Sequence, residues 1–175
     1  MRIQEHLKLS SVASLVALPW LKRDIWIPFT SSILIDVDHY LWYAATHRSL
    51  SLREAVRYFR QAQPTRRPEA KLFHHPIILG TLALLASVTR WRVLWLILAG
   101  MLFHVSLDAI HNTEFARIQQ TLVHNAQGRC PECGQQSDAL ELHTARVSKN
   151  FFTVYSSGNY IPLCHTCHER AHQGV

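Results

Sequence analysis

The first feature of this sequence is how little charge it has. Charged residues make up 17% of its 175 residues, which is low for a soluble globular protein. No ionisable side chain occurs between Pro76 and Val88, and His104 is the only one from Val93 to Leu107. This scarcity disfavours helices that are solvated on every side. It leaves short or tilted membrane spans, half-inserted helices and a very apolar soluble bundle as the alternatives.

Cysteine is equally scarce, and its distribution excludes a disulfide framework across the chain. All four cysteines lie in the last third, as the pairs Cys130/Cys133 and Cys164/Cys167. Two Cys-x-x-Cys turns predict one tetrahedral, structural zinc site in a reducing compartment, with reactive thiols as the alternative. Because a segment this short has little apolar core, we expect the metal to supply much of its folding free energy.

The charge that is present is mostly positive, with a formal net charge of +6. This balance indicates an anionic partner, either phospholipid headgroups or nucleic acid. The N-terminal residues have a short basic start and an apolar run, as a secretory signal does. However, Lys22, Arg23 and Asp24 stand where a small-residue cleavage site belongs, so we expect no cleavage there.

The spacing of apolar residues predicts a mainly α-helical N-terminal part. We expect an antiparallel bundle of four apolar helices, membrane-embedded or membrane-associated, with a kink at Pro28. Their uncharged cores are shorter than the ~20 residues that cross a bilayer comfortably. The predicted helices cover residues 7–20, 25–45, 74–89 and 91–112.

Three regions follow from this pattern. Residues 1–112 form the helical domain, 113–128 a connecting helix, and 129–175 a small zinc module. Within the helical domain, Ser51 to Glu54 fits a capping box that opens a basic amphipathic helix. That helix either lies on an anionic membrane surface or is a solvated helix packed on the bundle.

Histidine and aspartate fall at one end of the predicted bundle. In an up-down-up-down arrangement, the start of an odd helix and the end of an even helix lie together, and the candidate residues occupy these positions. His104, Asp108 and His111 are also spaced for a single helix face. For His47 and His74 taken singly, a helix-cap or interface role is the expectation. The candidate metal ligands of this domain are His6, Asp36, His39, His75, His104, Asp108 and His111.

This mixed set of imidazoles and carboxylates suits one or two divalent ions, such as Zn, Mn or Fe(II). Such a centre can lower the pKa of a bound water and polarise a phosphoryl or ester oxygen. Asp38 is our candidate catalytic residue, with a solvated helix-end charge as the alternative. For the whole set, the alternative is a structural role without metal.

The order of these residues resembles small bacterial inner-membrane proteins identified as metal-dependent hydrolases. The resemblance covers residues 1–112 and implies a membrane-bound hydrolase without defining its substrate. The chain departs from the family pattern in lacking a Gly after Arg48, and in flanking His75 with His and Pro rather than Thr and Ser. The matching elements are His6, Asp36-Val37-Asp38-His39, His47-Arg48, His74-His75 and His104-x-x-x-Asp108.

The cysteine-framed segment, residues 130–172, resembles an HNH endonuclease domain with a built-in zinc ribbon, a ββα-metal finger. The resemblance implies that His143 on a strand and Asn159 in a loop are catalytic-site residues. It also implies that His168 and His172 on a helix are further metal ligands, here for Mg or Zn. The family's general base normally follows the strand ligand, but this position is Thr144, which has no useful basicity near neutral pH. Either His143 is itself the base, or the module binds without cleaving.

The leading hypothesis is therefore a membrane-associated, metal-dependent hydrolase of phosphoester-type bonds that carries an HNH-like zinc module. In a first alternative, the module is a nuclease on a membrane anchor whose bundle metal is structural. In a second, the chain is non-catalytic and its module binds DNA or a partner. We expect the bacterial inner membrane as its location, with the zinc module on the cytoplasmic side.

Overall fold

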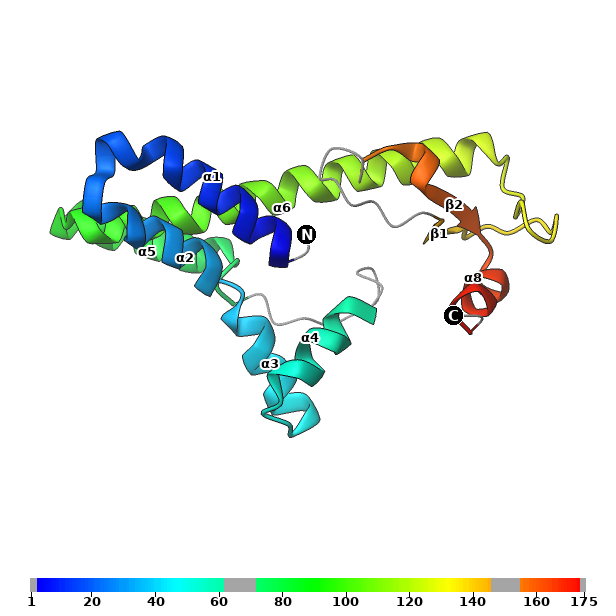
Figure 1. Cartoon of the computed structure of the whole chain (residues 1–175), viewed down its shortest axis with the longest axis horizontal. Helices are drawn as coiled ribbons and strands as arrows, with labels where there is room; N and C mark the ends of the chain where they lie inside the picture. The colour runs from blue at the N-terminus through cyan, green and yellow to red at the C-terminus, as the bar shows by residue number, and fades with distance from the viewer. Residues whose placement is uncertain (1–2, 62–71, 146–154, 174–175) are drawn as a thin grey trace. The chain divides into compact units, whose positions relative to one another are not determined.

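The structure is a computed structural model that describes residues 3–61, 72–145 and 155–173. In these ranges the chain is mainly helical and carries one small antiparallel sheet (Figure 1), which confirms the mainly α-helical character of the predicted fold and its small C-terminal sheet. In chain order the elements are α1 (Ile3–Leu21), η1 (Lys22–Ile25), α2 (Trp26–Leu34), α3 (Val37–His47), α4 (Leu52–Gln61), α5 (Pro76–Thr89), α6 (Arg92–Asn125), β1 (Glu141–Thr144), η3 (Ser157–Asn159), β2 (Tyr160–Leu163) and α8 (His165–Gln173).

The chain divides into two compact units, Met1–Leu107 and Asp108–Val175. The boundary falls inside α6, because the predicted helix 91–112 and the predicted connecting helix 113–128 are largely one continuous helix. No Gly or Pro interrupts the sequence from Met101 to Asn125, so nothing local ends the helix earlier. The chain then turns at Gln127 and Gly128, both with positive φ.

The second predicted helix, 25–45, is divided in the structure, but not at Pro28. Pro28 lies in the first turn of α2, where a missing N–H breaks no helical hydrogen bond. The break comes instead at Asp36, the residue immediately before α3, whose backbone leaves the helical pattern with ψ −1. This interruption leaves the Asp36 side chain at the junction of two helices rather than along one.

Small and polar residues line the contacts among α1, α2 and α6 in the first unit. The Ser32 hydroxyl donates to the hydroxyl of Ser10, 3.0 Å away, and the Ser31 hydroxyl is 3.1 Å from the carbonyl oxygen of Ile97. Gly100 of α6 faces Ser31 so closely that any Cβ there would overlap it. The backbones of these helices therefore lie close together, which is why the residues buried between them are small.

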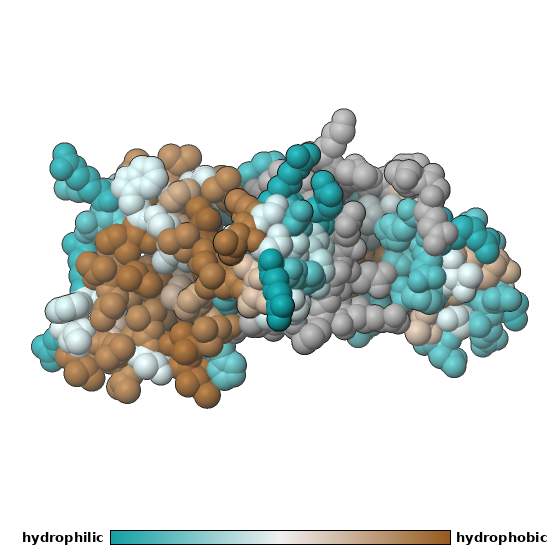
Figure 2. Space-filling model, turned by 90° about the horizontal axis from the view of Figure 1, so that it is seen from below, coloured by the Kyte–Doolittle hydropathy of each residue, from teal (hydrophilic) through white to brown (hydrophobic). Residues whose placement is uncertain are grey.

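Large apolar side chains are exposed on α1, α2 and α5 and at the turn before α6. Trp20 is 75% exposed and Trp91 66% exposed, and Figure 2 shows a broad hydrophobic surface on the face it draws. Among the helices of the described ranges, α6 alone is long and apolar enough to cross a membrane. Other strongly exposed apolar residues of this unit are Val12, Leu15, Val16, Trp26, Ile77, Leu84 and Val88.

The second unit is built on two strands and a short helix. Strand β1 pairs antiparallel with β2, with His143 opposite Ile161 and Thr144 opposite Tyr160, and α8 follows directly. The buried core consists of Cys130, Leu140, Leu163, Cys164 and Cys167, with Val123, Ala126 and Ala171 packed against it. Three of the five core residues are cysteines, so the core of this unit and its candidate metal site coincide.

Candidate metal centres

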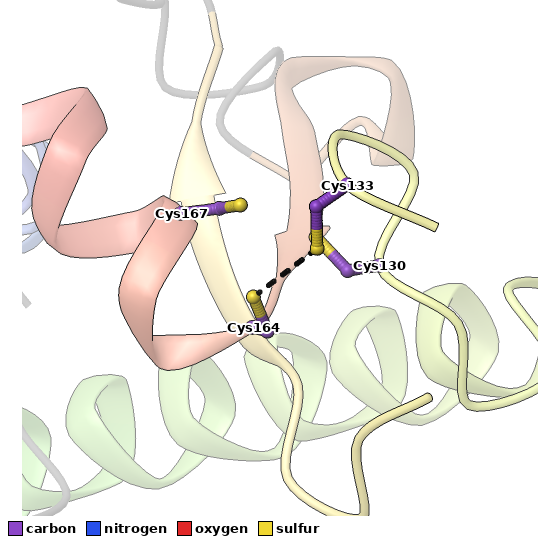
Figure 3. Close-up of side chains that lie close together, drawn as sticks. All are labelled: Cys130, Cys133, Cys164 and Cys167. Atoms are coloured by element: carbon purple, nitrogen blue, oxygen red, sulfur yellow. Dashed lines mark hydrogen bonds between the residues drawn. The ribbon is translucent and has the colours of Figure 1, made fainter. Parts of the chain in front are cut away.

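The four cysteines converge in the second unit (Figure 3). Cys130 and Cys133 lie on a tight turn that Gly134 closes, donating its N–H to the carbonyl of Cys130 at 2.8 Å with a φ of +71°. Cys164 and Cys167 stand at the start of α8. We name these four residues the cysteine cluster.

The spacing of the cysteine cluster fits a tetrahedral zinc ion. The Sγ atoms of Cys133 and Cys164 are 3.7 Å apart, far beyond a disulfide bond. Zn–S bonds of 2.3 Å at tetrahedral angles would separate two sulfurs by about 3.8 Å. The prediction of a four-cysteine site consistent with zinc is therefore confirmed in its geometry, as Figure 3 also shows.

Two thiols of the cysteine cluster have pKa values that are shifted in opposite directions. Burial opposes ionisation of Cys130, but hydrogen bonds from backbone groups, that of Cys164 first among them, lower the pKa of its thiol to about 6. Burial and the neighbouring thiols raise the pKa of Cys167 to about 12. The Cys130 thiolate is thus favoured and the Cys167 thiolate disfavoured, so a bound cation would stabilise Cys167 as a thiolate.

Three histidines, His143, His168 and His172, form a second group in the same unit, which we name the histidine triad. His143 comes from β1 and the other two from α8, one helical turn apart. Their ring centroids lie 4.7 to 5.4 Å apart, and one nitrogen from each lies within 4.8 Å of the others. Such a set of imidazoles from a strand and a helix offers three ligands to one divalent ion.

Two features prepare the triad for a metal. Burial, followed by the charges of His172 and His168, lowers the pKa of His143, which keeps that imidazole neutral and able to coordinate. Glu141, two residues earlier on β1, accepts from His168 Nδ1 at 2.8 Å. A carboxylate on Nδ1 fixes the tautomer that leaves Nε2 for a ligand, and Nε2 of His168 is 3.3 Å from Nε2 of His172.

Asn159 and Thr144 lie at the end of the strand pair where β1 ends and β2 begins. The backbone carbonyl of Asn159 accepts from the N–H of Ala145 at 2.8 Å, which ties the turn before β2 to the end of β1. Thr144 is exposed and follows His143 on β1. The position that resembles the HNH general base therefore has a hydroxyl and no basic group.

In the first unit, five of the predicted site residues lie close together with His74. We name these residues the helical cluster: His6, Asp36, Asp38, His39, His74 and His104. Asp36 Oδ1 lies 3.3 Å from His104 Nε2 and 3.6 Å from His74 Nε2. His6 stacks on His104 with ring centroids 3.9 Å apart. Residues from α1, the α2–α3 junction, the turn before α5 and α6 thus meet, as the sequence pattern predicted.

His104 is held in a defined tautomer. Its Nδ1 lies 2.7 Å from the carbonyl oxygen of Ser32, and since a carbonyl only accepts, Nδ1 carries a proton. In the neutral imidazole this leaves the lone pair on Nε2. That lone pair faces the Asp36 carboxylate. Two acceptors at this distance repel each other unless a proton or a metal ion lies between them. The residues therefore fit a cation between Asp36 and His104.

Asp38 is buried beside this site, 4% exposed. Its Oδ1 lies 2.7 Å from His39 Nδ1, and its Oδ2 accepts the backbone N–H of Phe73 at 3.0 Å. His74 Nδ1 is 3.6 Å from the same Oδ2. The carboxylate predicted to be catalytic is thus positioned by three neighbours and is not a solvated helix-end charge.

Three other histidine candidates have surroundings that differ from those of the helical cluster. His75 is exposed and caps α5, its Nδ1 accepting from the N–H of Ile77, because Pro76 starts the helix and makes residue 75 its N-cap. His47 stacks on Tyr43. Nδ1 of His111 lies 2.9 Å from the hydroxyl of Tyr155, and both residues belong to the second unit. Asp108 lies one turn after His104 on α6, with a carboxylate oxygen within 4.8 Å of a ring nitrogen of His104.

Sequence reasoning left three contributors without a role at these sites. His74, not His75, enters the helical cluster, and only the capping position set by Pro76 distinguishes the two. Glu141 could have been found, since residues two apart share a face of a strand. The carbonyl of Ser32 has no sequence signal, because any residue has one.

Comparison with known proteins identifies no relative: no family model, curated protein or solved structure matches this chain.

Proposed function

We propose that this chain is a membrane-associated, metal-dependent hydrolase of phosphoester bonds whose reaction centre is the helical cluster. The observation that carries the proposal is the pair of imidazole nitrogens, from His74 and His104, that face one oxygen of Asp36. A buried set of this composition is costly unless it binds an ion. The Asp36 side chain is 26% exposed, so the cluster is open to water and substrate at this residue.

A divalent ion at this position would supply a coordinated water of lowered pKa and a Lewis acid for a phosphoryl oxygen. The chain's own residues orient that centre. Ser32 fixes the tautomer of His104, and the Phe73 backbone and His39 fix Asp38. Rigid support of this kind is what a hydrolytic centre needs in order to hold its ligands in one geometry.

Membrane association is supported by where the apolar side chains lie. Soluble monomers seldom expose large contiguous apolar patches, yet α1, α2, α5 and α6 all expose Trp, Leu, Ile or Val side chains. Of the most apolar stretch of α6, 22% is buried within the chain. Lipid would cover this surface. The test is fractionation: we expect the protein in the membrane pellet after a high-salt wash and its release only by detergent.

A second activity is favoured by the histidine triad. Strands β1 and β2 with α8 give a ββα arrangement that presents three imidazoles together, with Glu141 behind His168. We propose that this module is an HNH-like domain that binds a divalent ion and nucleic acid phosphates. Because Thr144 offers no base, we expect binding of DNA to exceed cleavage.

Matched variants separate the two centres in the detergent-purified full chain. With bis(4-nitrophenyl) phosphate as substrate, we expect Asp36→Asn and His104→Gln to lower kcat/KM at least ~100-fold, since an active-site ion contributes several kcal/mol to transition-state stabilisation. His143→Ala and His168→Ala should leave this activity unchanged and weaken DNA binding. The reverse pattern would assign hydrolysis to the C-terminal module, and no metal-dependent turnover by any form would reject the hydrolase.

A further inference from the structure

We infer that the helical cluster holds two divalent ions bridged by the imidazole of His74. This inference rests on the proposed metal-dependent function and specifies its cofactor. One ion would lie among Asp36, His74 and His104, and the other among Asp38, His39 and His74. Each of these groups offers three ligand atoms within 4.8 Å of one another, and His74 belongs to both.

The two nitrogens of His74 face different carboxylates. Nε2 is 3.6 Å from Asp36 Oδ1, and Nδ1 is 3.6 Å from Asp38 Oδ2. A distance of 3.6 Å is too long for a direct hydrogen bond between these atoms. It is close to the about 3.4 Å that separates two ligands of one tetrahedral ion with bonds of about 2.1 Å. Each nitrogen of His74 therefore lies at a distance from a carboxylate oxygen that would let the two atoms bind the same ion.

The surroundings of His74 suit a bridging ligand. Its side chain is 10% exposed, and its ring centroid lies 5.2 Å from that of His104 and 5.4 Å from that of His39. It therefore lies beside an imidazole of each group. For an imidazole to bind through both nitrogens, its one N–H proton must be lost, and this proton leaves to solvent when the second ion binds. The carboxylates of Asp36 and Asp38 offset the added positive charge.

Neighbouring histidines provide a matched control. His75 follows His74 directly but is an exposed helix cap. His104 belongs to one of the two groups and His39 to the other. Removing His74 should therefore affect both ions, while removing His104 or His39 should affect one each and removing His75 should affect none.

The experiment measures zinc per chain in the detergent-purified full-length protein after loading and dialysis. Relative to wild type, we expect His74→Ala to lose two ions, His104→Ala and His39→Ala one each, and His75→Ala none. Because the zinc of the second unit is common to all forms, it cancels in each difference. Helical content by circular dichroism checks the fold. If His74→Ala fails to fold, His74→Gln, which keeps an acceptor near the Nε2 position alone, should lose one ion.

Each remaining outcome overturns a different claim. A loss of one ion from His74→Ala, equal to that from His104→Ala, would leave a single-ion centre and reject the bridge while keeping the proposed function. The same zinc content in wild type, His74→Ala and His104→Ala would mean that the cluster binds no ion, and would reject the proposed function as well.

Discussion

In residues 108–175 the buried core cluster is made of Leu140, Leu163 and three cysteines, with one buried polar residue, His168, whereas the first unit buries five polar residues together with its apolar ones. The buried polar residues of the first unit are His6, Ser10, Ser32, Asp38 and His104. Many of its large apolar side chains face outward instead. The second unit thus uses its candidate metal ligands as its core. The first unit buries candidate ligands among its helices, and many of its large apolar side chains are exposed.

This difference shows two ways in which a small unit can hold a metal site. In the second unit, loss of the ion removes the cross-link of the core itself, so folding and binding are one event. In the first unit, helix contacts such as Ser10–Ser32 and Ser31–Ile97 exist apart from the ligands. We therefore expect that unit to keep its helices without metal.

The largest effect that would test this contrast is loss of the cysteine cluster. We expect Cys130→Ser to remove the structural zinc and unfold residues 129–173, because apparent zinc-binding free energies of such sites are about 10–16 kcal/mol. Limited proteolysis and zinc analysis would show it, with α1 to α5 still protected. Thr166→Ala, an exposed change between two of the cysteines, is the control. If the C-terminal region of Cys130→Ser stayed fully protected from the protease, its folding would not depend on zinc, and the proposed difference between the two units would be wrong.

A smaller effect should come from the helix contacts of the first unit. In Gly100→Val the new side chain would overlap Ser31 and the Pro28 carbonyl, and we expect a loss of about 3 kcal/mol from overpacking. Gly80→Ala on α5 meets nothing within 4 Å and should stabilise by about 0.5–1 kcal/mol through helix propensity. Thermal unfolding in one detergent compares them. Equal midpoints would show that close approach of α2 and α6 contributes little.

Next in size is the support of the histidine triad. We expect Glu141→Gln to lower the metal affinity of the triad by about 10–100-fold, because the amide no longer fixes the His168 tautomer as a carboxylate does. Isothermal titration with Mn²⁺ or Zn²⁺ measures the change. Glu169→Gln, whose carboxylate contacts His165 on the exposed side of α8, serves as the control. An unchanged metal affinity in Glu141→Gln would show that the Glu141 carboxylate does not support the metal site.

The smallest expected effect concerns the start of α4. The hydroxyl of Ser51 accepts the N–H of Glu54 at 3.3 Å, while the Glu54 carboxylate accepts from Ser49 instead of reaching back. Half of the predicted capping box is therefore present. Ser51→Ala should cost about 1 kcal/mol, measured by chemical denaturation. Leu50→Ala, at a strongly exposed side chain, should cost less.

Much of the helical pattern could be predicted, and the errors have local causes. Apolar periodicity located α1, α5 and most of α6, because a helix that buries one face repeats every 3.6 residues. It missed the break at Asp36, where the apolar run continues on both sides. Pro28 was expected to kink its helix but lies in a first turn, a difference that depends on where the helix begins.

The sequence predicted the members of the cysteine cluster more completely than those of the helical cluster. Two Cys-x-x-Cys turns are local motifs, so all four members of the cysteine cluster followed from their spacing. For the helical cluster, the alternation of helix directions placed the right segments together. It could not decide which of two adjacent histidines, His74 or His75, points inward, nor that the Ser32 carbonyl would hold His104.

The sequence by itself determined the helical character, the zinc-type turns and the pool of ligands, because each depends on spacing within a few residues. Tertiary structure alone decided which of these side chains meet, and in which tautomer. The reason is physical: ligand atoms must approach to within a few ångströms, and that distance is set by where helices break, how closely they pack and which backbone groups they offer.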